Sequence, residues 1–311
     1  MAGSSTKVIL AALAGNTAIA VTKFIAAGLT GSSAMLSEGI HSLVDTGNQG
    51  LLLYGMRQAR RPPDRRFPFG HGKEIYFWSF VVAILIFAVG AGVSIYEGIL
   101  HIRHPEPVTD PLINYIVLGL AILFEGAAWW FALREFGKAK GQMGYIEAVQ
   151  RGKDPSMFVV LFEDSAALLG LLVALVGIAA AQLTGILWFD GLASVIIGLI
   201  LGATAIWLAI ETKSLLIGES ANREVVAGIR ALVEQEPAVE AIKELLTMHM
   251  GPDFVLVTMS ADFRDDLDAA EVERTIARLD RAIKAAYPEV KKVFIEAESL
   301  CPHGEEPAAA Q

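Results

Sequence analysis

The sequence predicts an α-helical membrane protein with six transmembrane helices, followed by a small cytoplasmic α+β domain. Hydrophobic residues make up 54% of the 311 residues and charged residues only 19%, and the apolar residues fall in long blocks. After about residue 211 the hydropathy drops, and shorter apolar runs are separated by turn residues. The long apolar blocks indicate a membrane domain. The drop in hydropathy after about residue 211 indicates a separate globular domain.

Six apolar blocks are long enough to cross a bilayer, for which about 20 residues suffice. The first continues to about Leu29 and lacks a small-residue cleavage signature, so we expect a true span and not a removable signal peptide. We therefore expect residues 1–211 to form the transmembrane domain. The six blocks begin near Val8, Met35, Ile75, Leu112, Ser156 and Trp188.

Loop charges predict the orientation, because the basic residues of short loops stay on the cytoplasmic side. The loops at 31–34, 101–111 and 182–187 hold one basic residue, Arg103, so we expect these loops outside. Both chain termini are then expected in the cytoplasm. No Arg- and Ser-rich transit segment precedes the first block, and we expect a bacterial inner membrane. The basic residues gather in the other two loops, as Arg57, Arg60, Arg61, Arg65, Arg66, Lys73, Arg134, Lys138, Lys140, Arg151 and Lys153.

The C-terminal region is acidic. From Thr212 onward it holds 19 acidic and 11 basic residues, which is −8 of the net charge of −9. This charge gives no basic surface for nucleic acid, and no nucleic-acid partner is expected. The single cysteine, Cys301, cannot form an intrachain disulfide, in agreement with a cytosolic location.

Residues 212–301 are predicted to form an α-β-β-α-β domain. Asn222 and Asp268 can each cap a helix, ending near 235 and 286. Strand-like runs are expected at 242–250, 254–263 and 290–297, with a hairpin at Gly251-Pro252-Asp253. A domain this small has a limited core, so we expect a homodimer, and residues 302–311 are expected to be disordered.

A polar stripe of four residues, Glu38, His41, Asp45 and Asn48, runs through the second apolar block. Their spacings of three, four and three place all four side chains on one face of a helix. Ionisable residues inside a membrane are costly and usually mark a pathway. His41 and Asp45 can chelate a divalent cation such as zinc, whereas the alternative is that they hydrogen-bond neighbouring helices.

The fifth block is expected to face this site, because it contains two adjacent carboxylates, Glu163 and Asp164. Neighbouring residues point about 100° apart on a helix, so only one of the two easily joins the same site. We expect Asp164 to be the better ligand candidate, with Glu163 as the other. The alternative is a salt bridge or a protonated interhelical hydrogen bond.

Four segments together resemble the cation diffusion facilitator family of zinc and related divalent-metal transporters. They are residues 37–45 (SEGIHSLVD), 69–73 (FGHGK), Asp164 and residues 216–219 (LIGE). The resemblance covers nearly the whole chain. It implies a six-helix domain, bound to the lipid bilayer, and a metallochaperone-like cytoplasmic domain that dimerises.

The resemblance also implies a tetrahedral metal site with two ligands four residues apart on the second span and two on the fifth. The first pair is His41 and Asp45. The second falls at Val160 and Asp164, and valine cannot ligate, so Glu163, Asn48 or a water molecule would complete the site.

A second site in some members lies in the loop before the third span, where this chain has Asp64 and His71. The alternative is that His71 only shapes a Gly-rich turn. In the cytoplasmic domain, zinc-binding histidines of some members are replaced by Lys243, Glu296 and Glu298, so metal sensing there is not expected.

The function implied is a secondary transporter that exports a divalent cation, Zn²⁺ first among the candidates, in exchange for protons by alternating access. The metal is then substrate and no cofactor is expected. Alternatives are a non-transporting membrane metal sensor or scaffold, and an intramembrane metalloenzyme. The second alternative is disfavoured because the chain lacks His-Glu-x-x-His and Gly-x-Ser-x-Gly motifs, and we expect no enzyme. Zinc, iron, manganese, cobalt and nickel all remain possible substrates.

Overall fold

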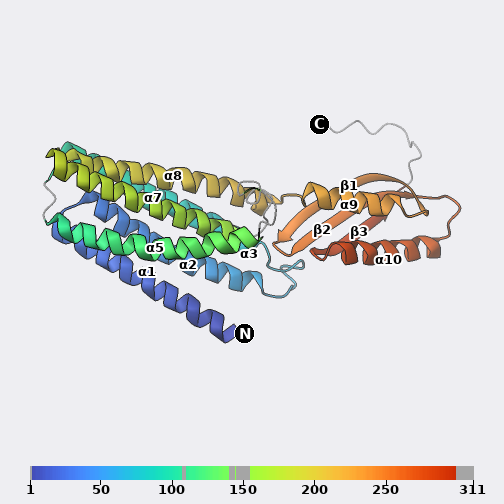
Figure 1. The fold of residues 1–311 in the computed structure, drawn as a ribbon. Coiled ribbons are helices and arrows are strands. Elements are labelled where there is room, and N and C mark those ends of the chain that lie inside the picture. Colours follow the sequence, from blue (N-terminus) through green and yellow to red (C-terminus); the bar gives the residue numbers. More distant parts are fainter. Residues whose placement is uncertain (1, 107–109, 140–143, 145–154, 299–311) are drawn as a thin grey trace. The chain divides into compact units, whose positions relative to one another are not determined.

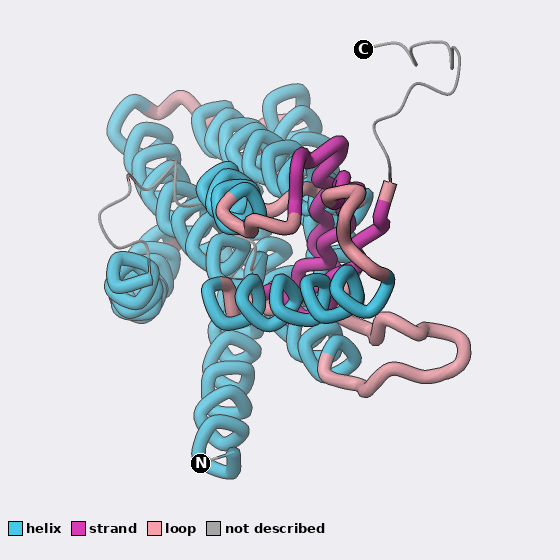
Figure 2. Tube along the Cα trace, turned by 90° about the vertical axis from the view of Figure 1, so that its right-hand side faces the viewer, coloured by secondary structure: helices cyan, strands magenta, loops and turns pink. Residues whose placement is uncertain are grey.

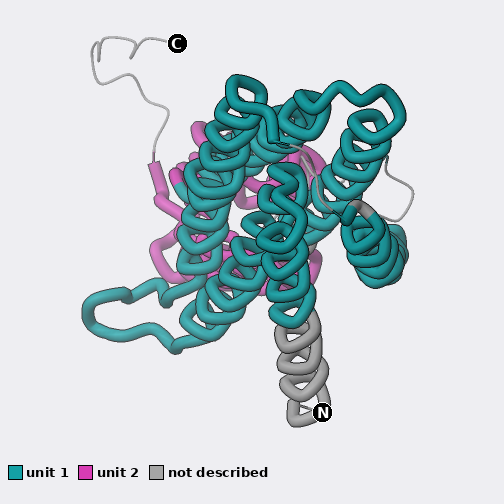
Figure 3. The backbone as a smooth tube through the Cα atoms, turned by 90° about the vertical axis from the view of Figure 1, so that its left-hand side faces the viewer, with its two compact units in different colours: residues 1–216 teal, residues 217–311 magenta. Residues whose placement is uncertain are grey.

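The computed structural model describes residues 2–106, 110–139, 144 and 155–298. It divides into two compact units, Met1–Leu216 and Ile217–Gln311 (Figure 3). The first unit consists of long helices and the second of a sheet with two helices (Figure 1). The expected disordered tail, 302–311, lies outside the described residues.

The helices of the first unit correspond to the apolar blocks of the sequence. Each block begins within a few residues of where its helix begins, apart from the first, whose helix starts earlier. The elements are α1 (Ala2–Thr30), α2 (Ser33–Ala59), α3 (Glu74–Leu85), the π-helical segment η1 (Ile86–Ala91), α4 (Gly92–Arg103), α5 (Pro111–Ala139), α7 (Pro155–Thr184) and α8 (Trp188–Ile217).

Four helical stretches among the described residues are long and apolar enough to cross a membrane. The prediction of six spans is therefore supported for the third to the sixth. α1 and α2 are helical as expected, but they are not among these four, and α2 carries the polar stripe. The four stretches are Glu74–Arg103, Leu112–Arg134, Phe158–Thr184 and Trp188–Ile217.

The third span contains a feature that the sequence did not predict, because η1 interrupts the α-helix between α3 and α4. A π turn inside a helix adds a residue and changes the direction in which the next side chains point. Beyond it, α4 packs closely on α8 through glycines. A Cβ added to Gly98 would lie 2.7 Å from the Gly191 carbonyl oxygen, so the two backbones nearly touch.

The second unit has the predicted α-β-β-α-β order, and its strands appear in magenta in Figure 2. β1 pairs antiparallel with β2 through the predicted hairpin, and β2 pairs parallel with β3. Asp268 caps α10 in a capping box with Glu271, whereas Asn222 precedes α9 without a side-chain cap hydrogen bond. The elements are α9 (Arg223–Glu234), β1 (Val239–Gly251), β2 (Phe254–Phe263), α10 (Ala269–Ala286) and β3 (Val290–Ala297).

Both helices of this unit pack on the same face of the sheet. Ile229 of α9 and Ile283 of α10 are fully buried in one cluster with Val255 and Val257, alternate residues of β2. The opposite face contributes exposed apolar side chains, including Phe294 of β3.

We predict that Gly98→Ala destabilises the first unit. The added methyl group meets backbone atoms of α8 that cannot rotate away, and overpacking of this kind costs about 1–3 kcal/mol. The measurement is the thermal unfolding midpoint of the detergent-solubilised protein. Gly119→Ala on α5 is the matched control, because a Cβ there has nothing within 4 Å. Equal midpoints for the two variants would contradict the close packing of α4 and α8.

Candidate functional site

The polar stripe of α2 is buried along its whole length. Glu38 and Asn48 are fully buried, and His41 and Asp45 retain only 1% and 8% of their exposure. His41 Nδ1 lies 3.2 Å from Asp45 Oδ1, one helical turn away. Neither ring nitrogen of His41 nor Oδ1 of Asp45 has a hydrogen-bond partner among the described residues. Buried donor and acceptor atoms without partners are unusual, and they leave this pair able to bind a cation.

α7 faces α2 through Glu163. Asn48 Nδ2 donates to Glu163 Oε1 over 2.6 Å, and the carboxyl groups of Asp45 and Glu163 also interact. Two carboxylates in contact repel unless a cation or a proton compensates their charge. The structure therefore brings Asp45, Asn48 and Glu163 together between the two helices, with His41 in contact with Asp45.

Asp164, the other candidate on α7, is half-buried and does not lie on the same line as Glu163. Its electrostatic neighbours are Glu163 and Glu125 of α5. Val160 packs with the apolar residues of the helix bundle. Within the described ranges, no group of three or more His, Cys, Asp or Glu side chains is close enough to hold a metal. The described residues therefore show pairs of candidate ligands and no assembled set of four.

Glu38, the first residue of the stripe, has a partner on another helix. Lys23 of α1 is fully buried, and its Nζ donates to Glu38 Oε2 over 3.1 Å and to Ser42 Oγ over 2.7 Å. This ion pair compensates the charge of Glu38 inside the helix bundle.

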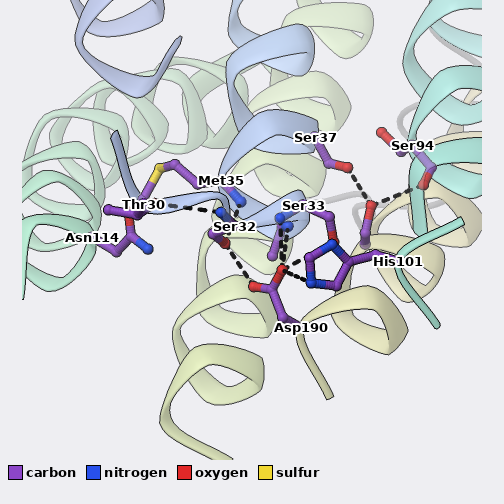
Figure 4. Close-up of polar contacts among 11 residues, drawn as sticks. Thr30, Ser32, Ser33, Met35, Ser37, Ser94, His101, Asn114 and Asp190 are labelled. Atoms are coloured by element: carbon purple, nitrogen blue, oxygen red, sulfur yellow. Dashed lines mark hydrogen bonds and ion pairs between the residues drawn. The ribbon is translucent and has the colours of Figure 1, made fainter. Parts of the chain in front are cut away.

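Asp190 holds the N-terminal end of α2 in place, as Figure 4 shows. Its fully buried carboxylate accepts from Ser32 Oγ (2.6 Å) and from the backbone N–H and hydroxyl of Ser33 (2.6 and 3.0 Å). His101 Nε2 of α4 lies 3.7 Å from Asp190 Oδ2. A carboxylate at a helix N-terminus compensates the free N–H groups and the helix dipole. Asp190 of α8 therefore fixes where α2 begins, and so fixes the position of His41 along the axis of the helix bundle.

The loop before α3 brings Asp64 and His71 together, with His71 Nε2 3.0 Å from Asp64 Oδ2. The Asp64 carboxylate also accepts from the backbone N–H groups of Arg66 and Phe67, each over 2.8 Å. Donation by Phe67, and then by His71, lowers the pKa of Asp64 below its usual value. His71 is buried and packs against Phe67 in a tilted arrangement, with ring centroids 4.6 Å apart. The pair that the sequence predicted is therefore formed, and its contacts also shape the turn.

In the second unit, Lys243 and Glu298 form an exposed ion pair, and Ser260 donates to Glu296 over 3.3 Å. An ammonium group occupies the position at which a metal would need an electron-pair donor. Cys301 lies outside the described residues.

Sequence reasoning missed two contacts that organise the site. The sequence shows Lys23 as a charged residue inside an apolar block, but it does not show that its partner is Glu38 of α2. Asp190 lies in the first turn of α8 but caps α2, and the sequence signal was Ser32-Ser33 at the start of that helix.

The sequence of the chain is similar to those of several known proteins. The family model described as the cation efflux transmembrane domain matches residues 9–217. The chain is 37% identical over 260 residues to the proton-coupled zinc antiporter SLC30A9, mitochondrial, of Xenopus laevis, covering 83% of this chain and 46% of that protein. It is 29% identical over 238 residues to metal tolerance protein C4 of Arabidopsis thaliana, covering 76% and 52%. It is 22% identical over 278 residues to the manganese efflux system protein MneS of Bacillus subtilis, covering 89% and 90%. The chain spans about half the length of the first two of these relatives.

We predict that Asp190→Ala lowers the stability of the first unit by about 3 kcal/mol, because it leaves several buried donors of Ser32 and Ser33 without an acceptor. Asp190→Asn keeps one acceptor oxygen and should cost less. The measurement is the unfolding midpoint in detergent. An Ala variant as stable as the wild type would show that the carboxylate does not hold α2.

We predict that Asp64→Asn loosens the turn before α3 at neutral pH. The pKa of Asp64 is lowered in the folded chain, so its contribution is present above the ordinary value and is lost as pH falls through the lowered one. Hydrogen–deuterium exchange of residues 60–73 should be faster in the variant at pH 7. The difference should shrink as pH falls from the ordinary aspartate value through the lowered pKa of Asp64. Asp253→Asn, in the hairpin of the second unit, is the control and should leave this peptide unchanged.

Proposed function

The chain belongs to the cation diffusion facilitator family, and on this premise we propose that it exports a divalent metal cation, Zn²⁺ in the first place, from the cytoplasm in exchange for protons. Members of this cation efflux family are transporters and not enzymes, and the chain is a multi-pass membrane protein. The observation that carries the proposal is the buried pair His41 and Asp45, which has unpartnered atoms and contacts a carboxylate of α7 through Asp45.

The donor set suits a transported metal. One imidazole nitrogen and one or two carboxylates bind zinc well, and Asn48 can supply a neutral oxygen. We propose His41, Asp45 and Asp164 as ligands, with Glu163 or Asn48 in place of the missing fourth ligand at Val160. Glu163 already contacts α2, whereas Asp164 points about 100° away from it around the axis of α7. We propose that α7 rotates between the two access states and so brings Asp164 to the site.

Proton exchange follows from the same groups. Metal binding requires unprotonated imidazole and carboxylates, so binding releases protons on one side and metal release permits proton uptake on the other. We propose alternating access as the mechanism, with the metal bound within the helix bundle. The relatives that share about half their length with this chain include proteins named as proton-coupled zinc antiporters.

We further propose a homodimer in a bacterial inner membrane, with both termini in the cytoplasm. The basic loops after α2 and α5 support this orientation. The pair Asp64 and His71 is proposed as a secondary metal-binding site in the first of these loops.

We predict that His41→Ala and Asp45→Ala each reduce metal flux by more than about 100-fold, since loss of even an outer partner of a metal ligand costs 10–100-fold. The measurement is Zn²⁺ uptake into proteoliposomes of the full chain, with a pH-sensitive dye inside and with Mn²⁺, Co²⁺, Ni²⁺ and Fe²⁺ as competitors. Glu298→Gln, in the exposed ion pair of the second unit, is the control and should transport normally. Normal flux in both site variants would refute the assignment.

A further inference from the structure

Lys23 is a full positive charge placed inside the helix bundle. Its side chain has no exposure, and its ammonium group contacts Glu38 and Ser42 of α2. A buried ion pair is weak support for stability, since two neutral side chains often pack as well. A charge kept in such a place therefore invites a functional explanation.

The two partners of Lys23 flank the candidate metal ligands. Glu38 lies one turn before His41 on α2, and Ser42 follows His41 directly. The same ammonium group acts electrostatically on Asp45 and on Glu125 of α5. In a medium of low effective dielectric such interactions extend over several ångströms, so a divalent cation at His41 and Asp45 would be repelled by Lys23.

Glu38 also faces the helix that carries Glu163. Its Oε1 has no hydrogen-bond partner among the described residues, and a Cβ added to Gly170 of α7 would lie 2.4 Å from that oxygen. The absence of a side chain at position 170 leaves room for the carboxylate between α2 and α7. Glu38 is thus placed where it would attract a cation, and Lys23 compensates that attraction.

We propose that Lys23 is a resident counter-cation that sets the metal affinity of the site, an inference that rests on the proposed transport function. Lys23 keeps Glu38 from acting as an additional metal ligand, and its charge weakens the hold of the remaining acidic groups. A transport site must bind its ion tightly enough to load it and weakly enough to release it. The ammonium group keeps the site within that range.

This role predicts opposite effects from removing each partner. Lys23→Met leaves a carboxylate beside the site without its counter-charge, so the metal binds more tightly and leaves more slowly. Glu38→Gln leaves the ammonium group without its counter-charge, beside the neutral hydroxyl of Ser42, so the metal binds more weakly. The double variant removes both charges and should return close to the wild-type affinity. An ion pair that only ties α1 to α2 would shift both single variants in the same direction.

The experiment measures Zn²⁺ flux into proteoliposomes and Zn²⁺ binding by calorimetry for the full chain. We expect KM to fall about tenfold with a lower maximal rate in Lys23→Met, and to rise about tenfold in Glu38→Gln, a shift of about 1.4 kcal/mol either way. The double variant should lie within about threefold of wild type. Lys213→Met, an exposed lysine of α8, is the matched control and should leave KM unchanged.

Shifts of both single variants in one direction, or no shift, would overturn the inference. If Lys23→Met does not fold, Glu38→Gln and the double variant carry the test, and equal affinities for these two would overturn it as well. A wild-type chain that moves no metal would instead refute the proposed function. Normal wild-type flux with same-direction shifts would refute only the role of Lys23.

Discussion

The structure of the first unit depends on the cost of burying ionisable side chains between helices. The polar stripe of α2 consists of four buried residues, and three of them are ionisable. Each must find a compensating charge, a hydrogen bond or a cation, because an unpaired charge in such surroundings is expensive. The helices around α2 supply these partners: α1 through Lys23, α7 through Glu163, and α8 through Asp190 at the N-terminal end.

These partners differ in one respect that bears on function. The carboxylates of Glu38 and Asp190 are compensated by groups of the chain itself, which makes them part of the framework. Asp45 contacts His41 and Glu163, but both ring nitrogens of His41 and Oδ1 of Asp45 have no hydrogen-bond partner among the described residues. A cation that reaches His41 and Asp45 therefore meets ligand atoms that the described residues do not already use. The framework contacts lie on either side of that place and hold α2 against α1, α7 and α8.

The sequence was sufficient for the elements and for one side of the site. Apolar block lengths predicted the helices, and the spacing of His41, Asp45 and Asn48 predicted a single buried face, because helical periodicity is a local property. The facing partners are not local. Which of Glu163 and Asp164 meets α2 depends on the rotation of α7 about its axis, and neither residue's neighbours determine that rotation. The π turn at Ile86–Ala91 and the capping of α2 by Asp190 likewise result from packing between helices distant in sequence. In the second unit the turn and capping residues are close to the elements they shape, and the predicted order was found throughout.

A metal can bind at this site although Val160 cannot act as a ligand. A transported ion is bound briefly, so a complete set of four protein ligands is not required, and a water molecule can occupy one position. Asn48 and Glu163 are already hydrogen-bonded to each other beside Asp45, and a cation could displace that bond and take both oxygens. The exchange would cost one hydrogen bond, whose net contribution is about 1 kcal/mol. Val160 itself packs in the apolar cluster, where it keeps the neighbouring surface of α7 dry. A site with one weak ligand position and an apolar surface beside it holds its ion by few bonds. Such a site favours release of the ion as much as binding.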